Sequence, residues 1–176
     1  LQAASNPSLI FEKSDEFDVT NDEFGIPNQK VNLSSIKNLD REIFDKIVNY
    51  SKLEIPSKLV EATKITKKLL GEGKKVIIWS SFITNMLIFE NQLLKEEKPI
   101  LIYGDISREE DDEVNRDKLI QEFKDDPNPR VLIATPASLA ESVSLHINSK
   151  TKEKVCSQAI YLDRNFNGAQ FMQSMD

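Results

Sequence analysis

The chain of 176 residues is poor in the residues from which many catalytic centres are built. It has one histidine, His146, and one cysteine, Cys156, so neither residue has the partners of a metal site or a Cys/His pair. A single cysteine cannot form an internal disulfide, which favours a reducing, cytoplasmic location. No apolar run approaches the ~18–20 residues of a membrane span, and residues 1–10 lack the pattern of a signal peptide.

Glycine is also scarce, with five residues in the chain. Gly73 and Lys74 lack the earlier glycine of a G-x-x-x-x-G-K-[ST] loop, and no predicted strand is followed by G-x-G-x-x-G. The sequence therefore predicts no P-loop, no dinucleotide-binding turn and no metal site. It contains no complete active site.

Charge argues against a protein that binds nucleic acid over its whole surface, because the net charge is −6 and the isoelectric point is about 5.0. Acidic residues gather at 11–25 and 105–117, and lysines gather at 57–75 and 150–154. A local phosphate-binding surface is compatible with this distribution, although each run alone is better explained as solvated surface.

Two regions are predicted along the chain. Residues 1–56 form a leading segment with an acidic loop at 12–35 and a short helix at 34–50. In residues 57–176, Ser57 is placed to cap a first helix, which the glycines of 71–73 end. The apolar residues expected on one face of this helix are Leu59, Ala62, Ile65 and Leu69.

Four apolar runs of strand length follow at regular intervals. Helices are expected between them, including one at about 82–96, an acidic one that ends near Phe123, and a final one after the last strand. This alternation predicts right-handed βαβ crossovers and a parallel sheet with helices on both faces, a three-layer αβα fold. The predicted strands are 75–80, 99–104, 130–134 and 159–163.

Ligands bind beyond the carboxyl ends of the strands in such sheets. The residues found there are small, with hydroxyl and amide groups, and three of the four sets begin a helix, where backbone N–H groups accept phosphate. Ordinary helix capping is the better explanation of any one set, and it explains the four sets together as well as phosphate binding does. The four sets are Ser80–Ser81, Gly104–Ser107, Thr135–Ser138 and Arg164–Asn167.

Four blocks in this order resemble the second RecA-like lobe of superfamily-two helicases, and more narrowly the bacterial Swi/Snf-related DNA translocases. The resemblance covers 57–176 well and 1–56 loosely, through "QAASNPSL" at 2–9. It implies the C-terminal motor lobe of a longer protein that uses ATP and Mg²⁺ and moves on double-stranded DNA, with the N-terminal lobe holding the P-loop. The blocks are 74–82, 103–123, 130–146 and 159–176.

The resemblance also implies roles for individual residues. Where the family has a glycine-rich turn, this chain has Ala140 and Ser142, so a more helical turn is expected. On the ATP side the resemblance places Glu141, Ser142, Gln173 and Asp176. Against the nucleic-acid backbone it places Ser80, Ser81, Gly104, Ser107 and Thr135.

The last block is expected to stop within the family's final motif. Gln173 fills its glutamine position, and the resemblance implies arginines at positions 177 and 180 of the parent gene. Arginines in such a position stabilise the transferring phosphate. Without them and without a P-loop, the isolated chain is expected to show no ATPase activity.

Two other functions share these features. One is a non-catalytic α/β domain that binds proteins, with the acidic stretch 105–126 as its docking surface. The other is a lobe of a different superfamily-two helicase that unwinds DNA or acts on RNA. The gene sequence beyond residue 176 would separate the first from a motor lobe, and a strand-separation assay would separate the second.

Overall fold

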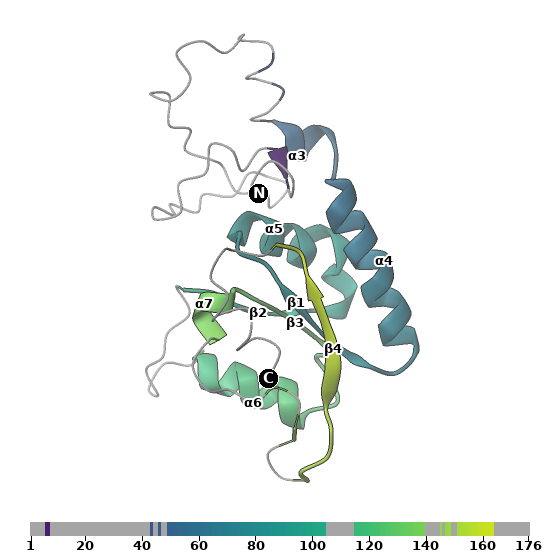
Figure 1. Ribbon diagram of the computed structural model, residues 1–176, viewed down its shortest axis with the longest axis vertical. Helices are drawn as coiled ribbons and strands as arrows, with labels where there is room; N and C mark the ends of the chain where they lie inside the picture. Colours follow the sequence, from purple (N-terminus) through teal and green to yellow (C-terminus); the bar gives the residue numbers. More distant parts are fainter. Residues whose placement is uncertain are drawn as a thin grey trace.

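In the part of the chain that the structure describes, the central sheet has four parallel strands in the order β2-β3-β1-β4 (Figure 1). The strands are β1 (Lys75–Trp79), β2 (Ile100–Ile102), β3 (Val131–Ala134) and β4 (Cys156–Tyr161). The computed structural model describes residues 6–7, 43, 46, 49–104, 115–139, 145, 147–148 and 151–163.

Successive side chains of the strands enter two separate cores, because neighbouring residues of a strand point to opposite faces. Val76 and Ile78 of β1 lie in one core, and Ile77 and Trp79 lie in the other. Strands β1, β2 and β3 are buried on both faces and read as continuous apolar runs, which explains why these three segments were recognisable in the sequence.

Helices cover both faces. Figure 1 shows α4 and α5 on one side of the sheet and α6 and α7 on the other, and the two cores contain side chains from these same helices. The predicted three-layer αβα fold is confirmed. The helices are α3 (Tyr50–Leu53), α4 (Ser57–Gly71), α5 (Ile83–Ile88), α6 (Arg116–Asp125) and α7 (Pro136–Leu139).

The buried face of α4 differs from the prediction. Ile65 is 44% exposed and Leu69 is half-buried, whereas Thr63 and Thr66 are buried. Each threonine hydroxyl donates to the carbonyl four residues earlier at 2.8 Å, so its methyl group can pack as an apolar surface. The face repeats at the 3.6-residue period of a helix and consists of Leu59, Ala62, Thr63, Thr66 and Leu70.

The ends of α4 are set by backbone geometry. Pro56 occupies the N-cap position and its side chain makes no capping bond, so the expected cap at Ser57 was wrong. The helix ends as predicted, because Gly73 adopts a left-handed φ of +76°. The N–H groups of Gly73 and Lys74 bond the carbonyls of Leu70 and Leu69 at 3.0 Å, the pattern of a Schellman motif.

Other predicted boundaries shift. The helix expected at 82–96 is divided into α5, a π-helical turn (Phe89–Leu93) and a 3₁₀ turn (Lys95–Glu97), and β4 begins before residue 159. Residues 43 and 46 are helical, as expected of 34–50, but most of that helix and all of 166–176 lie outside the described residues.

Part of the leading segment packs on the sheet domain. Asn6 is fully buried and its side-chain amide donates to Oδ1 of Asn85 in α5 at 3.4 Å. Among the described helices, none is long and apolar enough to cross a membrane. The same part of the chain has no group of three or more side chains that could hold a metal ion.

Candidate functional site

The residues that follow the four strands lie side by side, because the strands are parallel and adjacent. We call this line of residues the carboxyl edge. Hydrogen bonds between neighbouring strands continue into it and hold the first residues of the loops. The bonds run from Thr135 N to Ile102 O (3.1 Å), from Ser80 N to Ala134 O (3.0 Å) and from Leu162 N to Trp79 O (2.9 Å).

A buried carboxylate joins the loops after β1 and β4. Oδ2 of Asp163 accepts from Ser80 Oγ at 3.0 Å and from the Ser81 N–H at 2.9 Å. Asp163 is 5% exposed and Ser80 is fully buried, so water cannot replace the bond between their side chains. The Phe82 N–H donates to Ser80 Oγ at 3.2 Å, which closes a tight turn before α5.

This arrangement changes what the two serines can do. The hydroxyl of Ser80 faces the interior, whereas Ser81 is exposed and only its N–H is occupied by Asp163. Of the pair, Ser81 alone therefore presents a side chain to a ligand at the carboxyl edge.

Thr135 begins a second network, after β3. Its Oγ1 donates to Ser138 Oγ at 2.9 Å, and Ser138 Oγ lies 3.0 Å from the Ile102 carbonyl oxygen. Because the Thr135 N–H is already bonded within the sheet, a ligand can meet this half-buried residue only at its hydroxyl, which would have to give up its bond to Ser138 to donate to a phosphate. Pro136 then starts α7 at a position where its missing N–H costs nothing.

Arg116, in the first turn of α6, connects the loops after β2 and β3. It is 7% exposed, and its guanidinium donates to Ser138 O at 2.9 Å and to Tyr103 O at 3.4 Å. Asn115 caps the helix, with Oδ1 accepting from the Lys118 N–H at 2.8 Å. Arg116 is therefore a structural cation and faces backbone carbonyls.

Sequence reasoning missed both Asp163 and Arg116. A signal was present in each case. Asp163 is a charged residue at the carboxyl end of the apolar run 159–163, and Arg116 places a positive charge in a first helical turn, where the helix dipole disfavours it. What the sequence could not show is which neighbouring loop each side chain would contact.

The remaining predicted residues are only partly described. Gly104 lies exposed at the end of β2, in a turn at the carboxyl edge. Ser107, Glu141, Ser142, Gln173 and Asp176 lie outside the described residues.

The described part of the carboxyl edge does not fit a nucleotide by itself. It contains no glycine-rich phosphate loop, and its buried guanidinium, on Arg116, is bonded to two carbonyls. We therefore derive no chemical step through ATP or Mg²⁺ from these residues.

Three lysines of the two lysine-rich stretches lie away from the carboxyl edge. Lys152 and Lys154 belong to the turn that enters β4, and Lys75 begins β1, so all three are at the opposite, amino edge of the sheet. Burial lowers the pKa of Lys75, whose Nζ donates to the carbonyls of Phe123 and Asp126 at the end of α6. These lysines add no positive charge to the carboxyl edge.

Comparison with known proteins supports the fold. No protein-family model and no curated protein matches the chain. The structure is similar to one described as the C-terminal part of the Fun30 ATPase domain, with 19% identity and a TM-score of 0.55 over 80% of this chain and 46% of that one. A Sulfolobus solfataricus SWI2/SNF2 ATPase C-terminal domain also matches, with 21% identity and a TM-score of 0.47 over 76% and 60%.

The chain spans less than two thirds of the length of either structure. At 19% identity, the likeness to the Fun30 domain shows a shared RecA-like α/β fold.

Proposed function

We propose that this chain is the C-terminal motor lobe of a Swi/Snf-like, ATP-dependent DNA translocase or helicase. The observation that supports this most directly is the carboxyl edge, where small polar loops are held together by buried hydrogen bonds. An N-terminal lobe of the same protein would bind most of the ATP and Mg²⁺. The residues assigned to the ATP side, Glu141, Ser142, Gln173 and Asp176, would complete that site.

The proposed nucleic-acid contacts are made to the backbone. Ser81, Thr135 and the loop from Gly104 to Ser107 would meet the phosphates of double-stranded DNA, and such contacts hold the duplex without reading its sequence. Ser80 is assigned a supporting role, because its hydroxyl is buried against Asp163. A motor that passes every base needs this kind of contact.

The first test removes the Thr135 hydroxyl. In the chain joined to an N-terminal lobe that carries a P-loop, Thr135→Ala is expected to reduce DNA-stimulated ATP turnover about ten-fold, equal to the loss of one or two hydrogen bonds of about 1 kcal/mol. Turnover without DNA should be unaffected. The measurement is ATP hydrolysis over a range of duplex DNA concentrations.

Thr151→Ala is the matched control, because Thr151 is exposed in the turn at the amino edge of the sheet. Equal stimulation by DNA in the Thr135 variant and the control would remove Thr135 from the contacts. ATP hydrolysis by the 176-residue chain alone would contradict the proposed division between lobes. A motor that needs single strands, or RNA, would identify another superfamily-two helicase.

A second test uses Gly104. A Cβ atom there would meet no atom within 4 Å, so Gly104→Ala is expected to change the free energy of unfolding by less than about 0.5 kcal/mol. DNA-stimulated turnover should nevertheless fall several-fold if a phosphate approaches this backbone. Urea unfolding and DNA titration measure the two effects separately.

Gly73→Ala serves as the control for Gly104. Gly73 has a left-handed φ, so alanine there is expected to cost about 1 kcal/mol of stability and to leave DNA stimulation unchanged. A large loss of stability in the Gly104 variant would show that this glycine serves the fold instead of DNA contact.

A further inference from the structure

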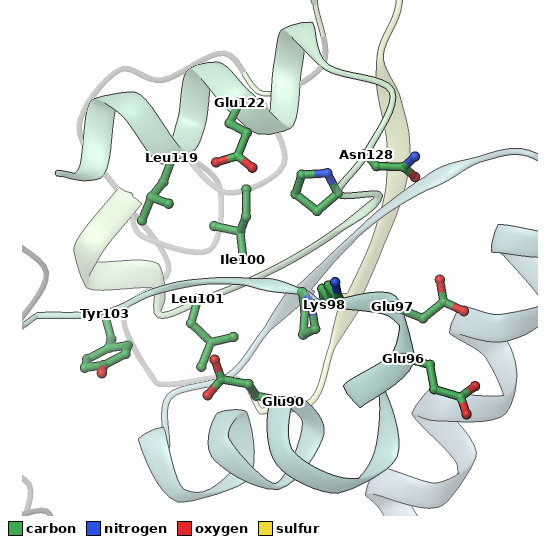
Figure 2. A pocket seen from close by; sticks show the side chains of 12 residues that line it. Glu90, Glu96, Glu97, Lys98, Ile100, Leu101, Tyr103, Leu119, Glu122 and Asn128 are labelled. Atoms are coloured by element: carbon green, nitrogen blue, oxygen red, sulfur yellow. The ribbon is translucent and has the colours of Figure 1, made fainter. Parts of the chain in front are cut away.

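A groove runs along the outer edge of β2, which is the edge strand of the sheet. Its volume is about 770 Å³. Figure 2 shows β2 crossing the groove, with Leu119 and Glu122 of α6 on one side and Glu90 of the π-helical turn on the other. Both helix layers therefore form walls around an edge strand.

The floor of the groove presents backbone hydrogen-bonding groups. The Ile102 carbonyl accepts from the Thr135 N–H, so the backbone of Ile102 faces β3. Backbone groups of a strand face its two sides alternately, and those of Leu101 therefore face the groove. In the described part of the chain no strand pairs with this side of β2.

The walls carry an excess of negative charge. Glu90, Glu96, Glu97 and Glu122 line the groove against a single lysine, Lys98. Glu97 lies 3.8 Å from a guanidinium nitrogen of Arg130. Among the described residues, no basic side chain forms a salt bridge with the other three carboxylates.

The charged form of Glu90 is disfavoured by its position in the groove wall. Glu90 is half-buried, and burial raises the pKa of its carboxyl group above the usual value. A half-buried carboxylate is stabilised when a cation approaches it. The groove therefore combines an open strand edge with acidic groups that favour a positively charged occupant.

We propose that this groove binds an extended, basic segment of a partner protein, which adds a strand to β2. Side chains of an added strand alternate between the two walls. A basic residue beside Glu122 and another at an odd spacing from it, beside Glu90, would meet both carboxylates. This function goes beyond the proposed motor, because it uses the outer edge of β2 and needs neither ATP nor DNA.

The negative charge of the groove favours a basic peptide over two other occupants, DNA and a second copy of the chain. Phosphates of DNA would be repelled by the four carboxylates. A second copy of the chain, joined edge to edge, would bring two sets of the same carboxylates together. Pro99, directly before β2, has no N–H, so the paired stretch is short, and much of the affinity should come from charge and fall with added salt.

The test measures binding of a fluorescein-labelled nonapeptide, acetyl-VKRVKRVKG-amide, to the full chain. Glu90→Gln combined with Glu122→Gln is expected to weaken binding at least ten-fold, and Glu61→Gln on the exposed face of α4 should leave it unchanged. A peptide methylated at alternate amide nitrogens keeps its charge but loses strand pairing. It should bind at least five-fold more weakly.

Three results would overturn the proposal: equal binding by the double variant and wild type, equal binding of the methylated peptide, or displacement of the peptide by duplex DNA. A dimer that dissociates in the double variant would assign the groove to a second copy. The peptide-binding measurement needs neither ATP nor DNA. If the double variant loses peptide binding but keeps normal stimulation of ATP turnover by DNA, the result would still support binding of a peptide in the groove.

Discussion

Replacing Asp163 by alanine is expected to lower the free energy of unfolding by about 2–3 kcal/mol. The buried Ser80 hydroxyl loses its carboxylate partner, and the Ser81 N–H loses an acceptor at 2.9 Å. A buried polar group left without its partner costs about 1–3 kcal/mol, and bonds to charged groups lie at the upper end of this range. Urea unfolding followed by circular dichroism measures the change.

A double-mutant cycle identifies the cause. If the bond between Asp163 and Ser80 is responsible, Asp163→Ala should cost clearly less in a Ser80→Ala background, since the donor is already absent. Asp163→Asn keeps an oxygen that can accept one of the two bonds and should show an intermediate loss. Fully additive costs would contradict a direct link between the loops after β1 and β4.

Asp163→Ala should reduce DNA-stimulated ATP turnover more than removal of the Thr135 hydroxyl does. Asp163 orients the turn that carries Ser81, so its loss is expected to reduce DNA-stimulated turnover more than ten-fold in the two-lobed protein. The matched readout is turnover without DNA, which should be much less affected. Equal losses with and without DNA would indicate general misfolding of the lobe.

The fold was predictable because its signals are local. Strands such as Val131–Ala134 are buried on both faces and give continuous apolar runs, and Gly73 marks the end of α4 through a conformation that few other residues adopt. The order of these segments was enough to predict a parallel sheet between two layers of helices. The composition of the buried face of α4 could not be predicted in the same way. Thr63 and Thr66 bond carbonyls of their own helix and are buried, whereas the larger apolar residue Ile65 is exposed.

The site was less predictable, because its important contacts join residues far apart in the chain. Ser80 was expected to face a ligand, but its hydroxyl turns toward Asp163, which is 83 positions away. The helix expected at 82–96 changes to a π-helical turn at Phe89, a buried core residue, and the local apolar pattern gave no sign of this change. The sequence therefore indicated which residues follow the strands at the carboxyl edge, whereas the structure was needed to show that Ser81 is exposed and Ser80 is buried.

Arg116 gives the second large prediction, since it holds two loops of the carboxyl edge through one side chain. Arg116→Ala is expected to lower the free energy of unfolding by about 3 kcal/mol, because the carbonyls of Ser138 and Tyr103 lose charged donors and a buried volume is left empty. Thermal and urea unfolding measure this loss. Asp117→Ala, an exposed change in the same helical turn, is the control and should cost well under 1 kcal/mol.

Two further substitutions separate the charge of Arg116 from its packing. Arg116→Met keeps the apolar stem and removes both donors, whereas Arg116→Lys keeps the charge but can reach only one carbonyl at a time. If the two bonds are the cause, lysine should restore part of the stability and methionine should restore less. Because Ser138 also bonds the Thr135 hydroxyl, the methionine variant should weaken DNA stimulation beyond its effect on stability. If the methionine variant is as stable as the protein with arginine, Arg116 stabilises this edge through the packing of its stem and not through its bonds to Ser138 and Tyr103.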